Sequence, residues 1–523
     1  MTTISVTDFG ASSASEDNAL AFARAARWMQ GHPGATMVIP PGDYHITSAL
    51  AQVGAAWISN HDGGFERKVG LVLHGLRDAH VSGDGARLLM HGQVVPIALR
   101  DCIGVRISGL AIDWPSPLHA WGEVVGGWAG FLDVRVRGGH PWRVVKERLV
   151  FQVDGRGEEM WGTYACDPQS LANLAGSGDH CGTAWGIPWV AEDRGEGIVR
   201  LNVHTPRVPP SGVPLILRHG DRKAPGIFAD GCRDLVIEDV TVHQASGMGI
   251  ICQRCQDVRL ERVRVVPSNG RPFSTNHDAI HFVSCRGHVQ VLDCTTSHHL
   301  DDALNCHGVY APVKQVSGDR LLLGVSQQQG NLIAMPGERI ALVDQKTFQI
   351  VSEHRVTERL ALSGSALELT VDGAVHDRSG LVVENLEDRC DLTVRGCEFR
   401  DNRARSILAT GGGRMIIEEN TINCPGAAVL VSGDTTYWFE SGATREIIVR
   451  NNRFERCTTH PGDWGEAMIV VKPLAAEISR PVHGRLEVSG NTVIGGGAVF
   501  ADLKHVSEVQ IVGNSGCGTV IRR

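Results

Sequence analysis

Residues 235–265 read LVIEDVTVHQASGMGIICQRCQDVRLERVRV and contain two copies of one short pattern. The first copy, LVIEDVTV, begins at Leu235, and the second, VRLERVRV, begins 23 residues later at Val258. Apolar and polar side chains alternate in each copy, as is typical of a β-strand, and turn-forming residues follow. Further copies begin at Val105, Leu392, Met415, Ile447, Arg485 and Val509. A strand that returns at this interval predicts a stack of similar coils.

A second column of strands lies between these copies in the sequence. Its members are GMGIIC (247–252), HDAIHF (277–282), DDALNC (301–306), ARSILA (404–409), GAAVLV (426–431) and GEAMIV (465–470). Two interleaved columns are typical of a parallel β-helix, in which coils stack about 4.8 Å apart and bury one continuous core. The expected fold class is therefore all-β, a right-handed parallel β-helix.

Segments outside the repeat predict a cap and two insertions. Residues 16–30, EDNALAFARAARWMQ, are expected to form a helix that covers the open N-terminal end of the coils. Two further segments show short alternating strands without the coil period, and each is expected to be a small β-barrel-like or sandwich module beside the helix. The predicted parts are the cap with the first coils (1–118), the first module (119–218), the central coils with candidate acids (219–310), the second module (311–384) and the C-terminal coils (385–523).

Composition excludes several classes of protein. The 523-residue chain has a net charge of -8 and no basic stripe, which argues against nucleic acid as a partner. It has no run of about 18 apolar residues, so no membrane span is expected. The first residues, MTTISVTDFG, lack the features of a signal peptide, which predicts a cytoplasmic protein, or a secreted one if a leader has been removed. The oligomeric state is left open, with a homodimer as one alternative.

Fourteen cysteines are scattered without paired spacing. Cys252 and Cys255 form a CxxC, but no second pair follows at the spacing of a zinc site. Several others lie inside strand-like runs, at Cys232, Cys294, Cys306 and Cys397. We expect buried free thiols that pack as small apolar groups.

The second column places acidic residues in line on adjacent coils. DAIHF (278–282) aligns with DALNC (302–306), so Asp278 stacks on Asp302 and His277 on Asp301. In the next copy, Arg405 falls over Asp302. Carboxyl groups in this register would lie about 5 Å apart, and such crowding raises the pKa of at least one of them. One carboxyl could then serve as an acid and others as bases, which is what glycoside hydrolysis requires.

Two other interpretations of these acids stay open. They could form a solvated ladder, or a structural pair between Asp302 and Arg405. Asp and His together could also bind a divalent cation such as Ca²⁺. No histidine pair has obvious chelating spacing, so neither a metal nor a cofactor is expected.

The run TNHDAIHFVSCRGHVQVLDCTTSHHLDDALNCHGVY, residues 275–310, resembles the core motif of glycoside hydrolase family 110. This family contains β-helical exo-α-1,3-galactosidases, including enzymes that cleave the blood-group-B antigen. The entrance DFGA…IPPGDYHI and the segment DTTYWFESG (434–442) are also similar. The resemblance implies an inverting enzyme that acts on galactose-terminated glycans. It also implies that Asp301 is the general acid and that Asp278 and Asp302 activate the water.

Further residues are candidates for sugar binding, which needs an aromatic platform and polar groups around the hydroxyls. Trp438 is expected on the same wall or packed in a loop, with Glu440 two residues later, and Trp161 could roof the cleft. Arg405 could bind a hydroxyl or tune Asp302. The remaining candidates are Asn305 in a polar ladder, His307 near the substrate, and His277 beside the acids.

Three functions are compatible with the sequence. The first is an inverting exo-α-galactosidase. The second is a β-helical hydrolase or lyase on another glycan, such as a uronate-containing polysaccharide; such a site would need several Lys or Arg, and few are expected on this wall. The third is a non-catalytic glycan-binding β-helix, which would not need three clustered acids.

Overall fold

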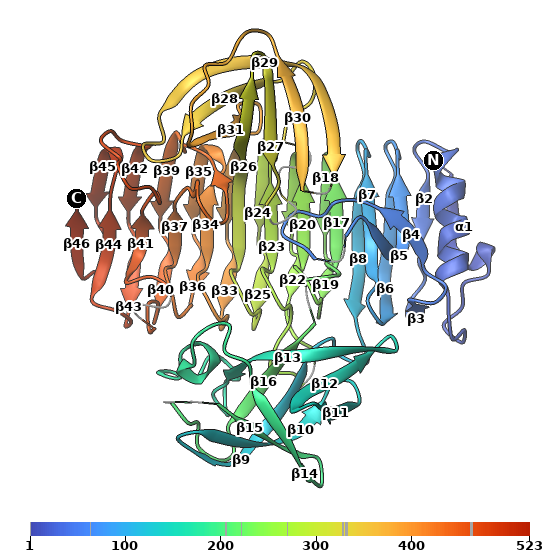
Figure 1. Ribbon diagram of the computed structural model, residues 1–523. Helices are drawn as coiled ribbons and strands as arrows, with labels where there is room; N and C mark the ends of the chain where they lie inside the picture. The colour runs from blue at the N-terminus through green and yellow to red at the C-terminus, as the bar shows by residue number, and fades with distance from the viewer. Residues whose placement is uncertain are drawn as a thin grey trace.

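The structure is a computed structural model that describes residues 2–523 except 63, 204, 206, 221, 269, 327–328, 330–332, 364 and 461–463. The described residues form an elongated parallel β-helix with helix α1 (Ala19–Gln30) at its N-terminal end and two β-rich modules at its sides (Figure 1). The expected fold class is confirmed. No helix among the described ranges is long and apolar enough to cross a bilayer.

One parallel sheet, here called sheet B, carries the second column of the repeat. Its strands pair coil by coil, so that Ile280, Leu304 and Ile407 lie in one register. The strands are β5 (Glu66–His74), β7 (Val95–Arg100), β17 (Ile227–Asp230), β20 (Ile250–Gln253), β23 (Ile280–Val283), β26 (Leu304–Ser317), β34 (Ile407–Thr410), β37 (Val429–Val431), β41 (Ala467–Val471), β44 (Val499–Leu503) and β46 (Thr519–Arg522). Two short strands pair antiparallel to it, β4 (Gln52–Ala55) with β5 and β38 (Glu440–Ser441) with β26.

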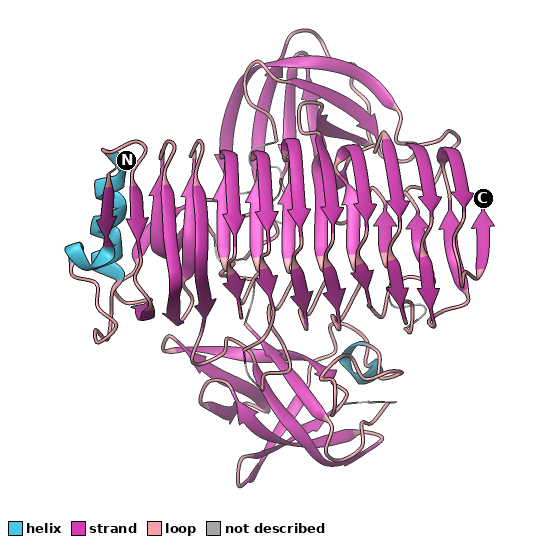
Figure 2. Cartoon of the chain, turned by 180° about the vertical axis from the view of Figure 1, so that it is seen from behind, coloured by secondary structure: helices cyan, strands magenta, loops and turns pink. Residues whose placement is uncertain are grey.

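The other column forms a second extended parallel sheet, whose strands stand in regular rows when seen from behind (Figure 2). Its strands are β1 (Thr3–Ser5), β2 (Thr36–Val38), β3 (Gly42–Thr47), β6 (His80–His91), β8 (Arg106–Asp113), β18 (Arg233–Glu238), β19 (Thr241–Val242), β21 (Gln256–Glu261), β22 (Arg264–Val265), β24 (Arg286–Leu292), β25 (Thr295–Ser297), β32 (Cys390–Arg395), β33 (Glu398–Arg400), β35 (Gly412–Glu418), β36 (Thr421–Ile422), β39 (Glu446–Arg450), β40 (Arg453–Glu455), β42 (His483–Ser489), β43 (Thr492–Ile494) and β45 (Val506–Val512).

The core of the helix follows from the alternation of side chains along each strand. Ile280, Leu304 and Ile407 point inward and are fully buried, whereas His281 and Asn305 occupy the outward positions between them. All fourteen cysteines, which fall in described parts of the chain, are free, and all but Cys517 are buried. The expectation of buried thiols is confirmed.

A ladder of asparagines, buried except for the partly exposed Asn514, ties the C-terminal coils together at one turn. The Nδ2 group of Asn420 donates to Oδ1 of Asn452, that of Asn452 to Asn491, and that of Asn491 to Asn514, at 2.8–3.0 Å. Each side chain also bonds to backbone groups of neighbouring coils. Buried amides satisfied in this way hold successive coils in one register.

Helix α1 covers the N-terminal end of the core. Phe22, Ala25, Ala26 and Met29 lie on its buried face and join the continuous apolar core. A 3₁₀ turn, η1 (Val6–Phe9), precedes it. The predicted capping helix over 16–30 is confirmed, although it begins only at Ala19.

The first module is one eight-stranded antiparallel sheet in the order β11-β12-β13-β16-β9-β10-β15-β14. It curls so that β14 meets the β11–β12 hairpin, where the Ala191 amide donates to the Glu147 carbonyl at 2.8 Å. The strands are β9 (Ala120–Trp128), β10 (Phe131–Gly138), β11 (Trp142–Val145), β12 (Arg148–Val153), β13 (Arg156–Ala165), β14 (Val190–Gly195), β15 (Ile198–Asn202) and β16 (Pro214–His219), with the 3₁₀ turn η2 (Asp179–Gly182) between β13 and β14.

The second module is a closed antiparallel barrel in the order β26-β27-β30-β29-β28-β31 and back to β26. Its new strands are β27 (Arg320–Gly324), β28 (Arg339–Asp344), β29 (Ile350–Ser363), β30 (Ala366–Val371) and β31 (Leu381–Asn385). Its core continues into the outer face of sheet B, where Phe228, Ile251 and Val283 pack.

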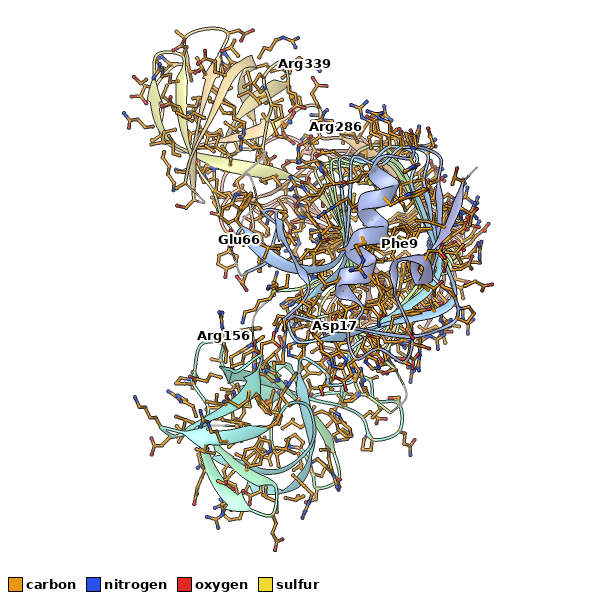
Figure 3. All side chains as sticks on the ribbon, turned by 90° about the vertical axis from the view of Figure 1, so that its right-hand side faces the viewer. Phe9, Asp17, Glu66, Arg156, Arg286 and Arg339 are labelled. Carbon is orange, nitrogen blue, oxygen red and sulfur yellow. The ribbon has the colours of Figure 1, made fainter. Side chains whose placement is uncertain are left out.

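Seen along the helix axis, both modules lean to the same side of the coils. Arg156 of the first module and Arg339 of the second lie on either side of Glu66 (Figure 3).

Candidate active site

A cavity of about 1140 Å³ lies on the outer face of sheet B. The central coils contribute Asp278, Asp301 and Asp302, and the first module contributes Trp161 and Arg218. Loops that follow β37 and precede β41 complete the lining. The cavity thus combines side chains from segments that are far apart in the sequence.

The coil register brings the three acids together as predicted. Asp278 and Asp302 precede paired strands on adjacent coils, and the Asp302 amide donates to Oδ1 of Asp278 at 3.3 Å. One carboxyl oxygen from each of Asp278, Asp301 and Asp302 lies within 4.8 Å of the others. Asp278 and Asp302 are buried, whereas the Asp301 side chain keeps 18% of its surface exposed.

Arg405 holds the Asp302 carboxyl from the next coil. Its Nη2 group donates to Oδ2 of Asp302 at 2.8 Å, and its Nε and amide groups donate to Oδ1 at 3.1 and 3.0 Å. A bidentate guanidinium–carboxyl contact fixes both partners in orientation. Burial nevertheless raises the pKa of Asp302 to about 8, because desolvation and the charges of Asp301 and Asp278 outweigh Arg405.

Asp278 begins a chain of hydrogen bonds that leads away from the cavity. His281 Nδ1 lies 2.8 Å from Oδ2 of Asp278, and His281 Nε2 lies 3.0 Å from His307 Nε2. His307 Nδ1 lies 2.6 Å from the carbonyl oxygen of Gly308. Since that oxygen can only accept, His307 Nδ1 carries a proton.

The number of protons in this row of hydrogen bonds, from Asp278 to the Gly308 carbonyl, follows in the same way. One proton lies between the two Nε2 atoms and another between His281 and Asp278, so the three hydrogen bonds hold three protons. Two imidazoles and one carboxyl group with three protons among them have no net charge. Burial lowers the pKa of His281 well below its usual value and, together with the charge of Asp301, raises the pKa of Asp278 well above its own. Both shifts favour the proton on Asp278.

Asp301 faces two guanidinium groups without a close bidentate contact. Its Oδ2 lies 3.9 Å from Arg222 Nη2, and its Oδ1 lies 4.0 Å from Arg403 Nη1. Arg403 is itself bound to Asp179 at 2.6 and 2.8 Å. Asp301 is thus the most accessible of the three carboxyl groups, and it is held by charge rather than by direct hydrogen bonds to these arginines.

The spacing of the three acids invites comparison with a cation site, since hard cations take oxygen ligands. Both oxygens of Asp302 already accept from Arg405, and Asp278 is bonded to His281 and to the Asp302 amide. A Ca²⁺ ion needs six to eight oxygen ligands. These residues therefore do not fit a divalent cation, and the absence of a metal from the reaction stays a prediction.

Six of the seven predicted substrate-binding residues line this cavity: His277, Asn305, Arg405, Trp438, Glu440 and Trp161. The seventh, His307, does not, because β38 pairs with β26 at Gly308 and covers it. Asn305 Nδ2 donates to Oε1 of Glu440 at 3.3 Å, as part of the expected polar ladder. The structure therefore places His307 behind the wall, where it contacts His281, rather than at the expected position beside a substrate.

The expectation of few cationic residues on this wall is wrong. Arg218, Arg222, Lys223, Arg403 and Arg405 all line the cavity. Three of these residues come from the first module or the segment after it, which carry no coil period, so the repeat could not align them with the acids. Arg403 lies two residues before Arg405 in DNRARS and could have been found from that spacing.

Comparison with known proteins agrees with the motif. The family described as right handed beta helix region matches residues 374–518. Alpha-1,3-galactosidase B of Bacteroides thetaiotaomicron is 29% identical over 508 residues, which cover 94% of this chain and 82% of that protein. Alpha-1,3-galactosidase A of Shewanella woodyi is 27% identical over 502 residues, or 93% and 81% of the two chains.

The resemblance to glycoside hydrolase family 110 is confirmed. It extends over nearly the whole chain and includes the segments on both sides of each module. Among solved structures, the A-module of the Azotobacter vinelandii mannuronan C-5 epimerase AlgE4 is 10% identical, with a TM-score of 0.44, over 99% of this chain and 97% of that chain.

Proposed function

We propose that the protein is an exo-acting, inverting glycoside hydrolase that releases terminal α-linked galactose, with α-1,3 as the linkage. The observation that carries this proposal is the cluster of Asp278, Asp301 and Asp302 in one cavity. The names of the relatives, alpha-1,3-galactosidases, support the choice of sugar and linkage.

Asp301 is the proposed general acid. It is the most exposed of the three carboxyl groups, so it can reach a glycosidic oxygen in the cavity. Arg222 Nη2 and Arg403 Nη1 lie 3.9 and 4.0 Å from its oxygens, and their positive charges would stabilise the carboxylate that remains after the proton has left. General acid assistance of this kind contributes about 10²–10⁴ in rate.

Asp278 and Asp302 are proposed to hold and deprotonate the attacking water. They lie on adjacent coils, and each is oriented by a partner, His281 in one case and Arg405 in the other. Proton transfer between Asp278 and His281 allows Asp278 to be a carboxylate when the water arrives, without a change in the net charge of the chain of hydrogen bonds.

Inversion is supported by the partners of the acids rather than by their separation. One oxygen of each acid lies within 4.8 Å of the others, and this spacing of single oxygens does not distinguish the carboxyl separations of about 5–5.5 Å in retaining enzymes and about 6.5–9.5 Å in inverting ones. A retaining enzyme needs one carboxylate with a free oxygen as nucleophile. Both oxygens of Asp302 bind Arg405, and both oxygens of Asp278 have hydrogen-bond partners, so the pair is better suited to gripping a water.

A second candidate is a hydrolase or lyase for an acidic glycan. It is favoured by Arg218, which is buried in the cavity wall, stacks on Trp161 at 4.2 Å and bonds only to Asn276 among the described residues. The other cations of the wall face carboxyl groups, which lowers the net positive charge offered to a uronate. This candidate therefore ranks second.

The test is release of sugar from a panel of substrates. Nitrophenyl α-galactoside, β-galactoside, α-glucoside and α-galacturonide would be compared with disaccharides that carry terminal galactose in α-1,3, α-1,4 and α-1,6 linkage. The proposal predicts hydrolysis of the α-galactoside and preference for the α-1,3 disaccharide. Cleavage of the galacturonide alone would replace it by the second candidate, and no cleavage at all would refute both.

A further inference from the structure

The cavity is larger than one sugar ring needs. Pockets of about 300–1,000 Å³ bury whole drug-sized ligands, and this one measures about 1140 Å³. Its lining continues from the three acids to Trp185 in the first module and to Trp464 in the loop before β41. Space therefore remains for the part of the glycan that carries the galactose.

Trp185 presents an uncovered ring to this space. Its side chain is 58% exposed, although it lies in the lining of a cavity. Two ring contacts support it: it stacks on Trp161 with ring centroids 5.8 Å apart, and it forms a T-shaped pair with His180 with ring centroids 4.3 Å apart. An exposed indole that is supported by neighbouring rings is suited to stacking on the apolar face of a pyranose.

The indoles of Trp185 and Trp464 contact the same buried guanidinium group, that of Arg403. The Arg403 Cζ atom lies 4.6 Å from the ring of Trp464 and 5.7 Å from that of Trp185. Arg403 is locked by Asp179 and by the Leu300 carbonyl, and its Nη1 lies 4.0 Å from Asp301. Trp185 is therefore tied to the side of the cavity where Asp301 lies, and Trp464 lies next to it, between Arg403 and Arg405, whose Cζ atom is 5.5 Å from the Trp464 ring.

The position of Asp301 indicates on which side of the scissile bond these rings lie. A general acid protonates the glycosidic oxygen, so the leaving sugar lies on its side of the scissile bond. We infer that Trp185 and Trp464 form a subsite for the leaving pyranose, the sugar that carries the cleaved galactose, with Trp185 as the stacking platform. This inference rests on the proposed function, because it uses Asp301 as the general acid.

The test compares two substrates that differ only in the leaving group. α-Galactosyl fluoride leaves nothing in the subsite, whereas a galactosyl-α-1,3-galactose disaccharide fills it. Trp185→Ala should lower kcat/KM for the disaccharide by about 5- to 10-fold, the size of one aromatic contact, and change that for the fluoride less than 2-fold. Trp185→Phe should restore most of the loss. Trp464→Ala should show the same selectivity.

Trp128→Ala is the matched control, since Trp128 is a 66% exposed tryptophan of the same module that does not line the cavity. This variant should leave kcat/KM for both substrates unchanged. Equal losses on both substrates in Trp185→Ala, or no loss beyond the control, would overturn the subsite while leaving the proposed function intact. A wild-type protein that cleaves neither substrate would instead refute the proposed function.

Binding gives a second readout that does not depend on turnover. In an Asp301→Asn background, calorimetry should show weaker disaccharide binding after Trp185→Ala and unchanged galactose binding. Loss of galactose affinity would place Trp185 in the galactose pocket and contradict the assignment.

Discussion

His281 Nδ1 lies 2.8 Å from Oδ2 of Asp278, and the opposite nitrogen of the same ring is bonded to His307. Asp278 thus lies at the cavity end of a buried row of hydrogen bonds. This row has no net charge and ends at the Gly308 carbonyl. An uncharged carboxyl group can be buried at low cost, which explains how Asp278 is tolerated 5% exposed beside two other acids.

An asparagine should replace Asp278 without loss of stability. Its amide can donate to His281 and its oxygen can accept from the Asp302 amide, as the protonated acid does. Because the pKa of Asp278 is raised above its unfolded value of 3.8, the stability it contributes is present below about pH 4 and is lost as the pH rises through the folded pKa. Asp278→Asn should therefore match the wild-type Tm only below about pH 4 and exceed it by about 1–3 °C at pH 9, measured by calorimetry.

Asp302→Asn is the matched variant on the adjacent coil. It also removes a carboxyl group whose raised pKa makes its ionisation costly at pH 9, but it removes the ion pair with Arg405 at the same time. Asp302→Asn should therefore gain less in Tm at pH 9 than Asp278→Asn. If both variants gained stability equally at high pH, the separate roles of His281 and Arg405 would be wrong.

Replacement of the general acid should depend on the leaving group. Asp301→Asn is expected to reduce kcat for an α-1,3-linked disaccharide by about 10²–10⁴. α-Galactosyl fluoride needs no protonation, so the same variant should retain most of its activity on that substrate. Asp278→Asn and Asp302→Asn should lose activity on both substrates, because both reactions need an activated water. A similar loss on both substrates in Asp301→Asn would argue against the acid role.

The pH dependence should reflect the raised pKa values of the water-activating pair. Asp302 has a pKa of about 8, and that of Asp278 is also raised by burial. Since the base must be ionised and α-galactosyl fluoride needs no protonated acid, kcat/KM for the fluoride should rise with pH until about pH 8 rather than level off just above pH 4. Initial rates between pH 4 and 9 would show this limb, and a flat profile from pH 5 to 8 would contradict it.

Chelation should have no effect on activity. The oxygens of Asp278 and Asp302 already have protein partners, and three arginines lie beside the three acids. Rates measured before and after dialysis against EDTA should agree. Lost activity that Ca²⁺ restores would show that the acids serve as metal ligands instead.

The coils and the acids could be predicted because one register governs them. Once Ile280, Leu304 and Ile407 are aligned, the positions of Asp278, Asp302 and Arg405 follow, even across the second module. Strand alternation likewise separates the inward Leu304 from the outward Asn305. In a repeat, residues at the same offset in successive coils occupy equivalent positions, so sequence spacing alone shows which of them stack.

The rest of the site could not be predicted from spacing. Trp185 and Arg218 come from the first module, whose antiparallel strands carry no coil period, so no offset relates them to the acids. The expected position of His307 beside the substrate differs from the structure for another reason. Its side chain does point outward from the strand, but β38 covers that point of β26. Covering by a segment far away in the sequence leaves no local signal.

The most direct test of the account is the anomer released first from an α-galactoside, followed by proton NMR before mutarotation. An acid at Asp301 and a water held by Asp278 and Asp302 predict β-galactose as the first product, and no covalent glycosyl-enzyme should be trapped. α-Galactose as the first product would contradict the account, because Asp278 or Asp302 would then act as a nucleophile.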